Sequence, residues 1–392
     1  MKIRSAAAAS LALALALSAC APSDDAADDD GPITVGLIAD LSGATADVGT
    51  PYHNGMLGYI DWLNDQGGID GRQIRALAED YAYIPDNAVT LYDRFIREGA
   101  VAIQGWGTGD TNILAERIND DEIPFMSASY DETLVDPSTR PYNFVVAPTY
   151  SDQMRVALNW IAEDAGGEAG VAVFHHDSAF GQAPLADGAA WVEEQGLDLS
   201  LTNFPMPGDG NMVGLLRRAH NQNKTYVVIQ NVSTPAANVA RDLADQGLDM
   251  TIVCLNWCGD EIFIDTAGPA AAEGHVFVQP FTPPQADVPG LADVAEYLDG
   301  RGQTLEDVGL HYAQGWYTMH VMAEGIRRAL DGGSLSGEAI KEALESAPIE
   351  TGGVVGGGTV SFSPDSHRGS SGTGIYRVEN GEMTVVELGV TP

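Results

Sequence analysis

A glycine-rich turn is the part of the chain with the clearest capacity for chemistry. In "VAIQGWGTGDTNILAERI", residues 101–118, Gly105, Gly107 and Gly109 alternate between an apolar run and a segment with helical character. The first N–H groups of a helix have no partners within the helix, so such a turn can hold an anion. The candidate anions are the pyrophosphate of a dinucleotide, a phosphate and a carboxylate.

The spacing of these glycines argues against a nucleotide. A dinucleotide fingerprint is G-x-G-x-x-G after the first strand of its unit, with an acidic residue downstream. This chain has G-x-G-x-G after a later strand. A carboxylate is therefore the favoured anion, and a tight turn without a ligand is the alternative.

Other motifs give no sign of catalysis. The sequence contains no G-x-S-x-G elbow, no H-E-x-x-H and no P-loop. His175 and His176 are adjacent at the end of a predicted strand, so their side chains point to opposite faces and do not easily share a metal ion. The run 352–358 has the composition of a phosphate loop but lacks its Lys-Ser/Thr, and it predicts flexible hinge backbone. We expect no enzymatic activity, no metal site and no cofactor.

Two cysteines stand close together in "VCLNWCGDE". Cys254 and Cys258 can form a disulfide only if the chain turns between them, because an extended stretch holds the Cα atoms too far apart. The sequence leaves a disulfide and free thiols equally open. A metal site is a weaker alternative, since no histidine lies at ligand spacing.

Apolar runs alternate with amphipathic helical segments from residue 33 onward. The runs are "ITVGLIAD", "VAIQGW", "IPFMSAS", "GVAVFHH", "TYVVIQN" and "MTIVCLN". Strands that are apolar throughout predict parallel sheets covered by helices on both faces. The alternation covers 33–130 and restarts over 170–268, which predicts an α/β fold with two Rossmann-like lobes. Ligands bind beyond the carboxyl ends of such strands, so two facing lobes would form a cleft.

The first residues have the pattern of a targeting segment. Lys2 and Arg4 precede an apolar run that is too short to span a bilayer and that ends in "LSAC" at Cys20. This ending resembles a bacterial lipobox, which implies a signal peptide over 1–19 and a lipid on Cys20. Residues 20–32 are acidic and predict a flexible tether. We expect an extracytoplasmic, membrane-anchored protein.

The composition limits the partners. The 392 residues include 56 Asp and Glu but only 19 Lys and Arg, for a net charge of −37. So acidic a surface repels nucleic acid and anionic lipid, and we expect to find neither bound. Adaptation to salt and a GC-rich genome both fit the scarcity of lysine.

Five stretches occur along the chain in a familiar order. They are "ITVGLIADLSGATADVGTPYHNGMLGYIDWLNDQGGIDGRQI", "IPFMSASYDETLVDP", "PTYSDQ", "SAFGQAPLADG" and "FIDTAGPAAAEG". Together they resemble the solute-binding proteins of ABC importers, of the branched-chain amino-acid-binding (Leu/Ile/Val-binding-like) type with the type I periplasmic fold. The resemblance implies a monomer that closes over a small solute and delivers it to membrane permease subunits.

The resemblance also implies how the lobes divide. It places hinge crossings near 147–151, 279–283 and 347–352. The first lobe would then comprise residues 33–148 and 282–348, and the second lobe 149–281 and 349–392.

The same resemblance implies a set of ligand contacts at the glycine-rich turn and the loop that follows. Thr108 and Thr111 match hydroxyls that hold the carboxylate, and Trp106 matches an apolar contact. The loop after the next strand would add Ser129, Tyr130 and Asp131, although Asp131 could instead cap the following turn. From the second lobe, Phe180 would form an aromatic lid or merely pack, and the remaining expected contacts are Asn231, Ser233, Asn256 and Trp257.

One position departs from the pattern of leucine-binding relatives. They place a carboxylate near the position of Asn256 to pair with the ammonium of the ligand, and a buried ammonium without such a partner is costly. Either Asp131 supplies the charge, or the solute has no ammonium group. The expected aromatic side chains suit a flat carboxylate or a cation held by ring faces. We expect an amino acid or an analogue first, and an aromatic or other organic acid or an amide second. A ligand sensor for a membrane receptor is the alternative role.

Overall fold

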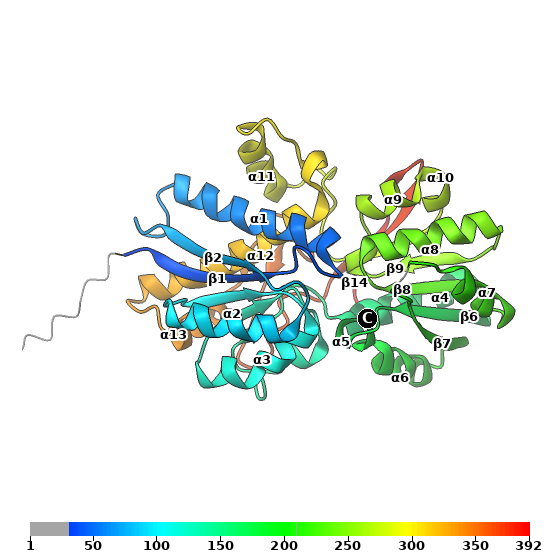
Figure 1. Ribbon diagram of the computed structural model, residues 1–392, viewed down its shortest axis with the longest axis horizontal. Helices are drawn as coiled ribbons and strands as arrows, with labels where there is room; N and C mark the ends of the chain where they lie inside the picture. Colours follow the sequence, from blue (N-terminus) through cyan, green and yellow to red (C-terminus); the bar gives the residue numbers. More distant parts are fainter. Residues whose placement is uncertain (1–30, 209) are drawn as a thin grey trace, which may run out of the picture. The chain divides into compact units, whose positions relative to one another are not determined.

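The computed structural model describes residues 31–208 and 210–392 (Figure 1). The predicted signal peptide over 1–19, the lipid-modified Cys20 and the tether up to residue 30 lie outside the described residues. No helix in the described part is long and apolar enough to cross a membrane.

The first sheet has five parallel strands in the order β2-β1-β3-β4-β5. They are β1 (Ile33–Ala39), β2 (Ile74–Asp80), β3 (Ala102–Gly105), β4 (Phe125–Ser127) and β5 (Asn143–Phe144). Its helices are α1 (Ala46–Asp65), α2 (Pro85–Arg97), α3 (Thr108–Asp120), α11 (Pro289–Asp299), α12 (Leu305–Asp331) and α13 (Gly337–Ser346). β1 is buried at every position, as expected for a central parallel strand with helices on both faces.

The second sheet has the order β14-β13-β10-β9-β8-β6-β7. Its strands are β6 (Ala169–His175), β7 (Leu199–Pro205), β8 (Tyr226–Gln230), β9 (Thr251–Cys254), β10 (Val276–Gln279), β13 (Thr373–Glu379) and β14 (Glu382–Val390). The helices are α4 (Tyr150–Ala165), α5 (Ala179–Gln182), α6 (Leu185–Gln195), α7 (Val213–Asn221), α8 (Ser233–Gln246), α9 (Glu261–Ala267) and α10 (Pro269–Ala272). The pairs β10–β13 and β13–β14 are antiparallel, and the other pairs of this sheet are parallel.

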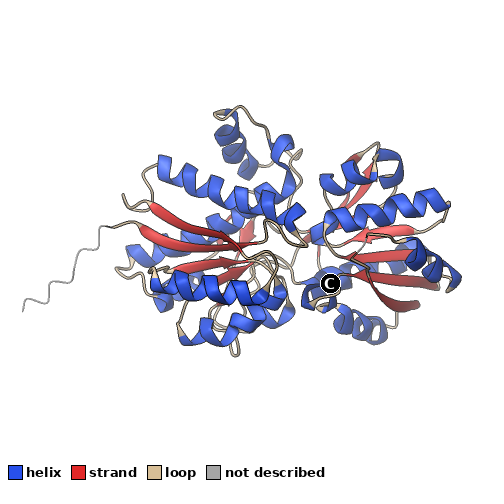
Figure 2. Cartoon of the chain, in the orientation of Figure 1, coloured by secondary structure: helices blue, strands red, loops and turns tan. Residues whose placement is uncertain are grey.

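Short elements complete the described part. They are the 3₁₀ turns η1 (Glu132–Leu134) and η2 (Asn256–Cys258) and the hairpin of β11 (Ile349–Glu350) and β12 (Thr359–Val360). Figure 2 shows helices on both faces of each sheet. The α/β class predicted from the sequence is therefore confirmed.

We call the elements on the first sheet the first lobe and those on the second sheet the second lobe. The largest apolar core cluster contains Tyr130 and Trp316 of the first lobe together with Tyr150, Phe180 and Trp257 of the second. Because this cluster joins residues of both lobes, it does not locate a boundary between them. The predicted boundaries and hinge crossings stay predictions.

A buried polar network also links the lobes. His311 of α12 has Nε2 2.5 Å from Oδ2 of Asp260, the residue that caps α9, and both side chains are fully buried. Nδ1 of His311 lies 2.8 Å from Oε1 of Gln314, whose Nε2 donates to the Tyr130 hydroxyl at 2.7 Å. Asp260 further accepts from the Ser233 hydroxyl. One carboxylate is thus shared by both lobes.

The backbone of α12 is adapted to this network. The N–H of Leu310 donates to Oε1 of Glu261 at 2.9 Å, and Gly309 leaves the helical conformation with φ of 78°. A Cβ atom at Gly309 would lie 1.9 Å from the same Glu261 oxygen. Glycine is therefore required here for two reasons, the positive φ and the close approach of the carboxylate.

Substitution of His311 by Gln is expected to reveal the pH dependence of this link. Burial alone would lower the pKa of His311, but the hydrogen bond and charge of Asp260, with the charge of Glu261, outweigh it and raise the pKa. Because the folded-state pKa of His311 lies above the unfolded value of about 6.5, protonated His311 stabilises the folded protein fully below that unfolded value. This stabilisation is lost as the pH rises through the folded-state pKa. In chemical denaturation, the free energy of unfolding of the wild type should exceed that of His311→Gln by about 3 kcal/mol near pH 6, and this difference should decline toward pH 9.

His275 provides the matched control. Burial lowers the pKa of His275 to about 4. The stabilising contribution of this histidine is therefore present above the unfolded pKa and is lost as pH falls toward 4. His275→Gln should therefore lower the free energy of unfolding more at pH 8 than at pH 5, which is the opposite of the trend expected for His311→Gln. If His311→Gln lowered the free energy of unfolding equally at every pH, a charged pair between His311 and Asp260 would be contradicted.

Candidate functional site

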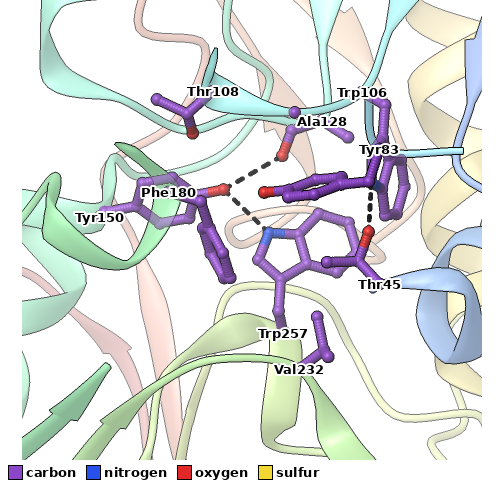
Figure 3. Close-up of a pocket in the computed structure, with 10 residues that line it drawn as sticks. Thr45, Tyr83, Trp106, Thr108, Ala128, Tyr150, Phe180, Val232 and Trp257 are labelled. Atoms are coloured by element: carbon purple, nitrogen blue, oxygen red, sulfur yellow. Dashed lines mark hydrogen bonds between the residues drawn. The ribbon is translucent and has the colours of Figure 1, made fainter. Parts of the chain in front are cut away.

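A cavity of about 20 Å³ lies where residues of the two lobes meet (Figure 3). A water molecule needs roughly 10–15 Å³ on this measure, so a larger solute can enter only when the lining side chains separate. The lining residues are Thr45, Tyr83, Trp106, Gly107, Thr108 and Ala128 from the first lobe, and Tyr150, Phe180, Val232 and Trp257 from the second.

Most of this lining follows the carboxyl end of a strand. Trp106 comes directly after β3, Ala128 directly after β4, and Val232 two residues after the end of β8. Trp257 lies on η2, shortly after β9. Parallel α/β sheets bind ligands at this edge, so the topology itself places the cavity at the expected position.

The predicted glycine-rich turn forms one wall. Gly107 precedes α3, and its N–H donates to Oδ2 of Asp110 at 3.1 Å. The Thr108 hydroxyl lines the cavity and lies 2.7 Å from the Ser129 hydroxyl. Thr111 instead donates its hydroxyl to the carbonyl of Gly107 at 2.7 Å and is not among the lining residues. Thr108 is thus the threonine of the pair that faces the cavity.

Aromatic side chains form the opposite walls. The ring centroids of Trp106 and Trp257, one from each lobe, are 5.1 Å apart. The indole N–H of Trp257 donates to the Tyr150 hydroxyl at 3.1 Å, and that hydroxyl donates to the carbonyl of Ala128 at 3.4 Å (Figure 3). The indole N–H of Trp106 donates to Thr45 Oγ1 at 2.8 Å. Both indoles therefore use their donors within the protein.

The loop after β4 lies beside the lining. Ser129 reaches Thr108, as described, and Tyr130 stacks on Trp257 with centroids 5.8 Å apart. Asp131 accepts from the N–H of Thr133 at 2.9 Å and caps η1. The structure therefore gives Asp131 the capping contact that the sequence offered as its alternative.

Some of the predicted contacts of the second lobe line the cavity, and the others lie beside the lining. Phe180 and Trp257 line the cavity. Asn231 accepts from the N–H of Val232 at 2.8 Å, and Ser233 donates to the carbonyl of Trp257 at 3.2 Å. Asn256 is fully buried, and its side-chain amide has no partner among the described residues. These three polar residues surround the lining without belonging to it.

Sequence reasoning named Gly107 in the anion-holding turn but missed five other lining residues, which are Thr45, Tyr83, Ala128, Tyr150 and Val232. Two of them adjoin predicted contacts, since Ala128 precedes Ser129 and Val232 lies between Asn231 and Ser233. Tyr150 lies in the "PTYSDQ" stretch, and its position at the first turn of α4 was the available signal.

Acidic side chains stand directly behind the lining. Asp40 accepts from the N–H and the hydroxyl of Thr45, both at 2.8 Å. Asp110 accepts from Gly107 and from the Tyr81 hydroxyl at 2.9 Å. Burial, the largest cause, raises the pKa of Asp110 to about 7 despite these hydrogen bonds. Burial also raises the pKa of Tyr83 and of Tyr150, so their hydroxyls stay neutral.

Of the two alternatives that the sequence left open for Cys254 and Cys258, the structure contains free thiols and no disulfide between them. Cys254 ends β9 and Cys258 ends η2, and both are fully buried. Burial raises the pKa of both thiols. Among residues 31–208 and 210–392, no cluster of three or more His, Cys, Asp and Glu side chains is placed to hold a metal ion.

Several known proteins are similar to this chain. A branched-chain amino acid ABC transporter protein from Thermus thermophilus, solved with bound valine, has a TM-score of 0.87 and 26% identity, and the match covers 92% of this chain and 97% of that one. A leucine-, isoleucine-, valine-, threonine- and alanine-binding protein from Pseudomonas aeruginosa is 23% identical over 321 residues, 81% of this chain and 83% of its own length.

A third similarity is at the level of the fold. A solute-binding protein of an ABC transporter from Rhodopseudomonas palustris, solved with 3,4-dihydroxybenzoic acid, has a TM-score of 0.75 and 20% identity, and the match covers 93% of this chain and 96% of that one.

The family is shown by a match over most of the chain. The model of the periplasmic binding protein family matches residues 32–382, which include every strand of both sheets except β14, of which only the first residue is matched. The resemblance drawn from the five sequence stretches is thereby confirmed, and the chain belongs to the periplasmic binding protein family.

Proposed function

We propose that this protein captures a small carboxylate-bearing solute, an amino acid or an analogue, and delivers it to the permease of an ABC importer. The observation that carries the proposal is the cavity between Trp106 and Thr108 of the first lobe and Phe180 and Trp257 of the second. A solute held by both lobes loses its water only when they close. Its differential affinity for the closed form then drives closure.

The first turn of α3 suits the carboxylate. Thr108 begins this helix and lines the cavity, so the proposed contacts of the carboxylate are its hydroxyl, which also lies 2.7 Å from the Ser129 hydroxyl, and the first N–H groups of the helix. The helix dipole adds a favourable positive potential at the same end. A carboxylate at this turn would receive charge-assisted hydrogen bonds without any basic side chain.

The relatives support the amino-acid class. The Thermus thermophilus protein was solved with valine, and the Pseudomonas aeruginosa protein is named for five amino acids. The aromatic lining favours an aromatic acid as the second candidate, the class to which the compound bound by the Rhodopseudomonas palustris protein belongs. The family is extracytoplasmic, and we propose that the lipid on Cys20 anchors the protein to the membrane.

A thermal-shift screen of the mature chain tests this function. A solute that binds only the folded protein raises its melting temperature by mass action. We expect at least one carboxylate-bearing compound in a set of amino acids, aromatic acids and amides to raise it in a dose-dependent way. If only compounds without a carboxylate did so, the carboxylate site would be wrong, and if no compound did, the function itself would be.

Thr108→Ala is expected to weaken binding of the solute that the screen identifies. The lost charge-assisted hydrogen bond should cost about 1.5–3 kcal/mol in binding free energy, measured by calorimetry. Thr108→Ser keeps the hydroxyl and serves as the control, with affinity close to wild type. Unchanged affinity in Thr108→Ala would remove this residue from the site.

Phe180→Ala is expected to speed the dissociation of the solute. Phe180 is buried against Tyr150, with ring centroids 5.4 Å apart, and it lines the cavity from the second lobe. Loss of the ring should raise the off-rate by about tenfold, because contacts formed on closure mostly slow release. Stopped-flow tryptophan fluorescence measures this rate, with Phe180→Leu as the apolar control. An unaltered off-rate would make Phe180 a packing residue.

A further inference from the structure

The cavity is lined by rings and lacks charges. Five of its ten lining residues are aromatic, namely Tyr83, Trp106, Tyr150, Phe180 and Trp257. Among the described residues that line it, none is Asp, Glu, Lys, Arg or His. The charges of a solute must therefore be met by ring faces, by hydroxyls and by the first turn of α3.

The surroundings disfavour a solute with a net negative charge. Asp40 and Asp110 stand directly behind Thr45 and Gly107, and both acids are at most 2% exposed. With no basic side chain in the lining, only the first turn of α3 would offset the net charge of a monoanion such as benzoate, and these carboxyl groups lie close to that turn. A zwitterion enters with no net charge and avoids this cost.

The lining also disfavours a primary ammonium group. Such a group has three N–H donors and, when buried, needs an anionic partner. Three acceptors in or behind the lining already have partners: Thr45 Oγ1 accepts from Trp106, the Ala128 carbonyl accepts from Tyr150, and Asp40 accepts twice from Thr45. Asn256 Oδ1 has no partner among the described residues, but it carries no charge. The ammonium of an ordinary amino acid would therefore find no anionic partner in the lining.

A fully methylated ammonium has the opposite requirements. It carries a positive charge but no N–H group, so it needs no hydrogen-bond acceptor. Its methyl groups pack against aromatic rings, and the negative ring faces attract the charge, most strongly when water is excluded. The acidic residues behind the lining add a favourable field for a cation.

We propose that the solute is a compact zwitterion that pairs its carboxylate, at the first turn of α3, with a quaternary ammonium group held among the aromatic side chains of the two lobes. This inference rests on the proposed function, since it specifies the solute of the same cavity. It assigns Tyr83, which the sequence did not single out, to the recognition of the cationic end.

Calorimetry with matched pairs of compounds tests the inference. The mature chain is titrated with glycine and trimethylglycine, with proline and N,N-dimethylproline, and with benzoate, all at the same pH and salt concentration. We expect the methylated member of at least one pair to bind tenfold or more tightly than its parent and than benzoate.

The failures of the two proposals are distinguishable. Tighter binding of the unmethylated parents or of benzoate, or binding of leucine with no response to either methylated compound, would overturn the quaternary-ammonium inference while the solute-binding function stood. The absence of any binding compound in both this series and the screen would reject the function as well.

Tyr83 supplies the test within the protein. It lies in the loop between β2 and α2, so its substitution leaves both sheets intact. Tyr83→Leu removes the ring and should weaken trimethylglycine binding by about 5- to 30-fold, whereas Tyr83→Phe keeps the ring and should stay within about twofold of wild type. Equal affinities of the Leu and Phe variants would overturn the role of this ring.

Discussion

The contact between Trp106 and Trp257 is the interaction on which the rest of the site depends. These side chains come from the two lobes and lie with ring centroids 5.1 Å apart. Each indole is fixed by a hydrogen bond, Trp106 to Thr45 and Trp257 to Tyr150, so the rings are held in place by the strand-end loops. A solute between the lobes must separate these rings or replace their contact, and the proposed function couples binding to lobe movement for that reason.

Charge is distributed around this contact in a consistent way. The cavity lining is neutral, while buried carboxyl groups stand behind it at Asp40, Asp110 and Asp260. Asp260 is hydrogen-bonded to His311 of the other lobe, which also stacks on Trp257 with centroids 5.3 Å apart. His311 therefore links the lobes through Asp260 and also supports the aromatic wall through Trp257. In the proposed function, closure and solute recognition would share one set of side chains.

The fold could be predicted from the sequence to a large extent, and the site only in part. β1 and β8 are buried at every position and consist mainly of apolar residues, so the alternation of apolar runs and helices indicated both sheets. The turn before α3 was recognised because its glycines stand out. The role of Thr111 could not be read from spacing, since a threonine in the first turn of a helix can bond the carbonyl four residues back. Thr45 and Tyr83 lie in loops and Tyr150 begins α4, and only the tertiary fold brings these three segments together.

A crystal structure of the mature chain with the solute that raises its melting temperature is the most direct measurement of the central claim. The account predicts that the carboxylate lies within hydrogen-bond distance of Thr108 and the first N–H groups of α3. It also predicts that the other end of the solute contacts Phe180 or Trp257 of the second lobe. A solute bound by one lobe alone, or with its carboxylate held elsewhere, would contradict the account.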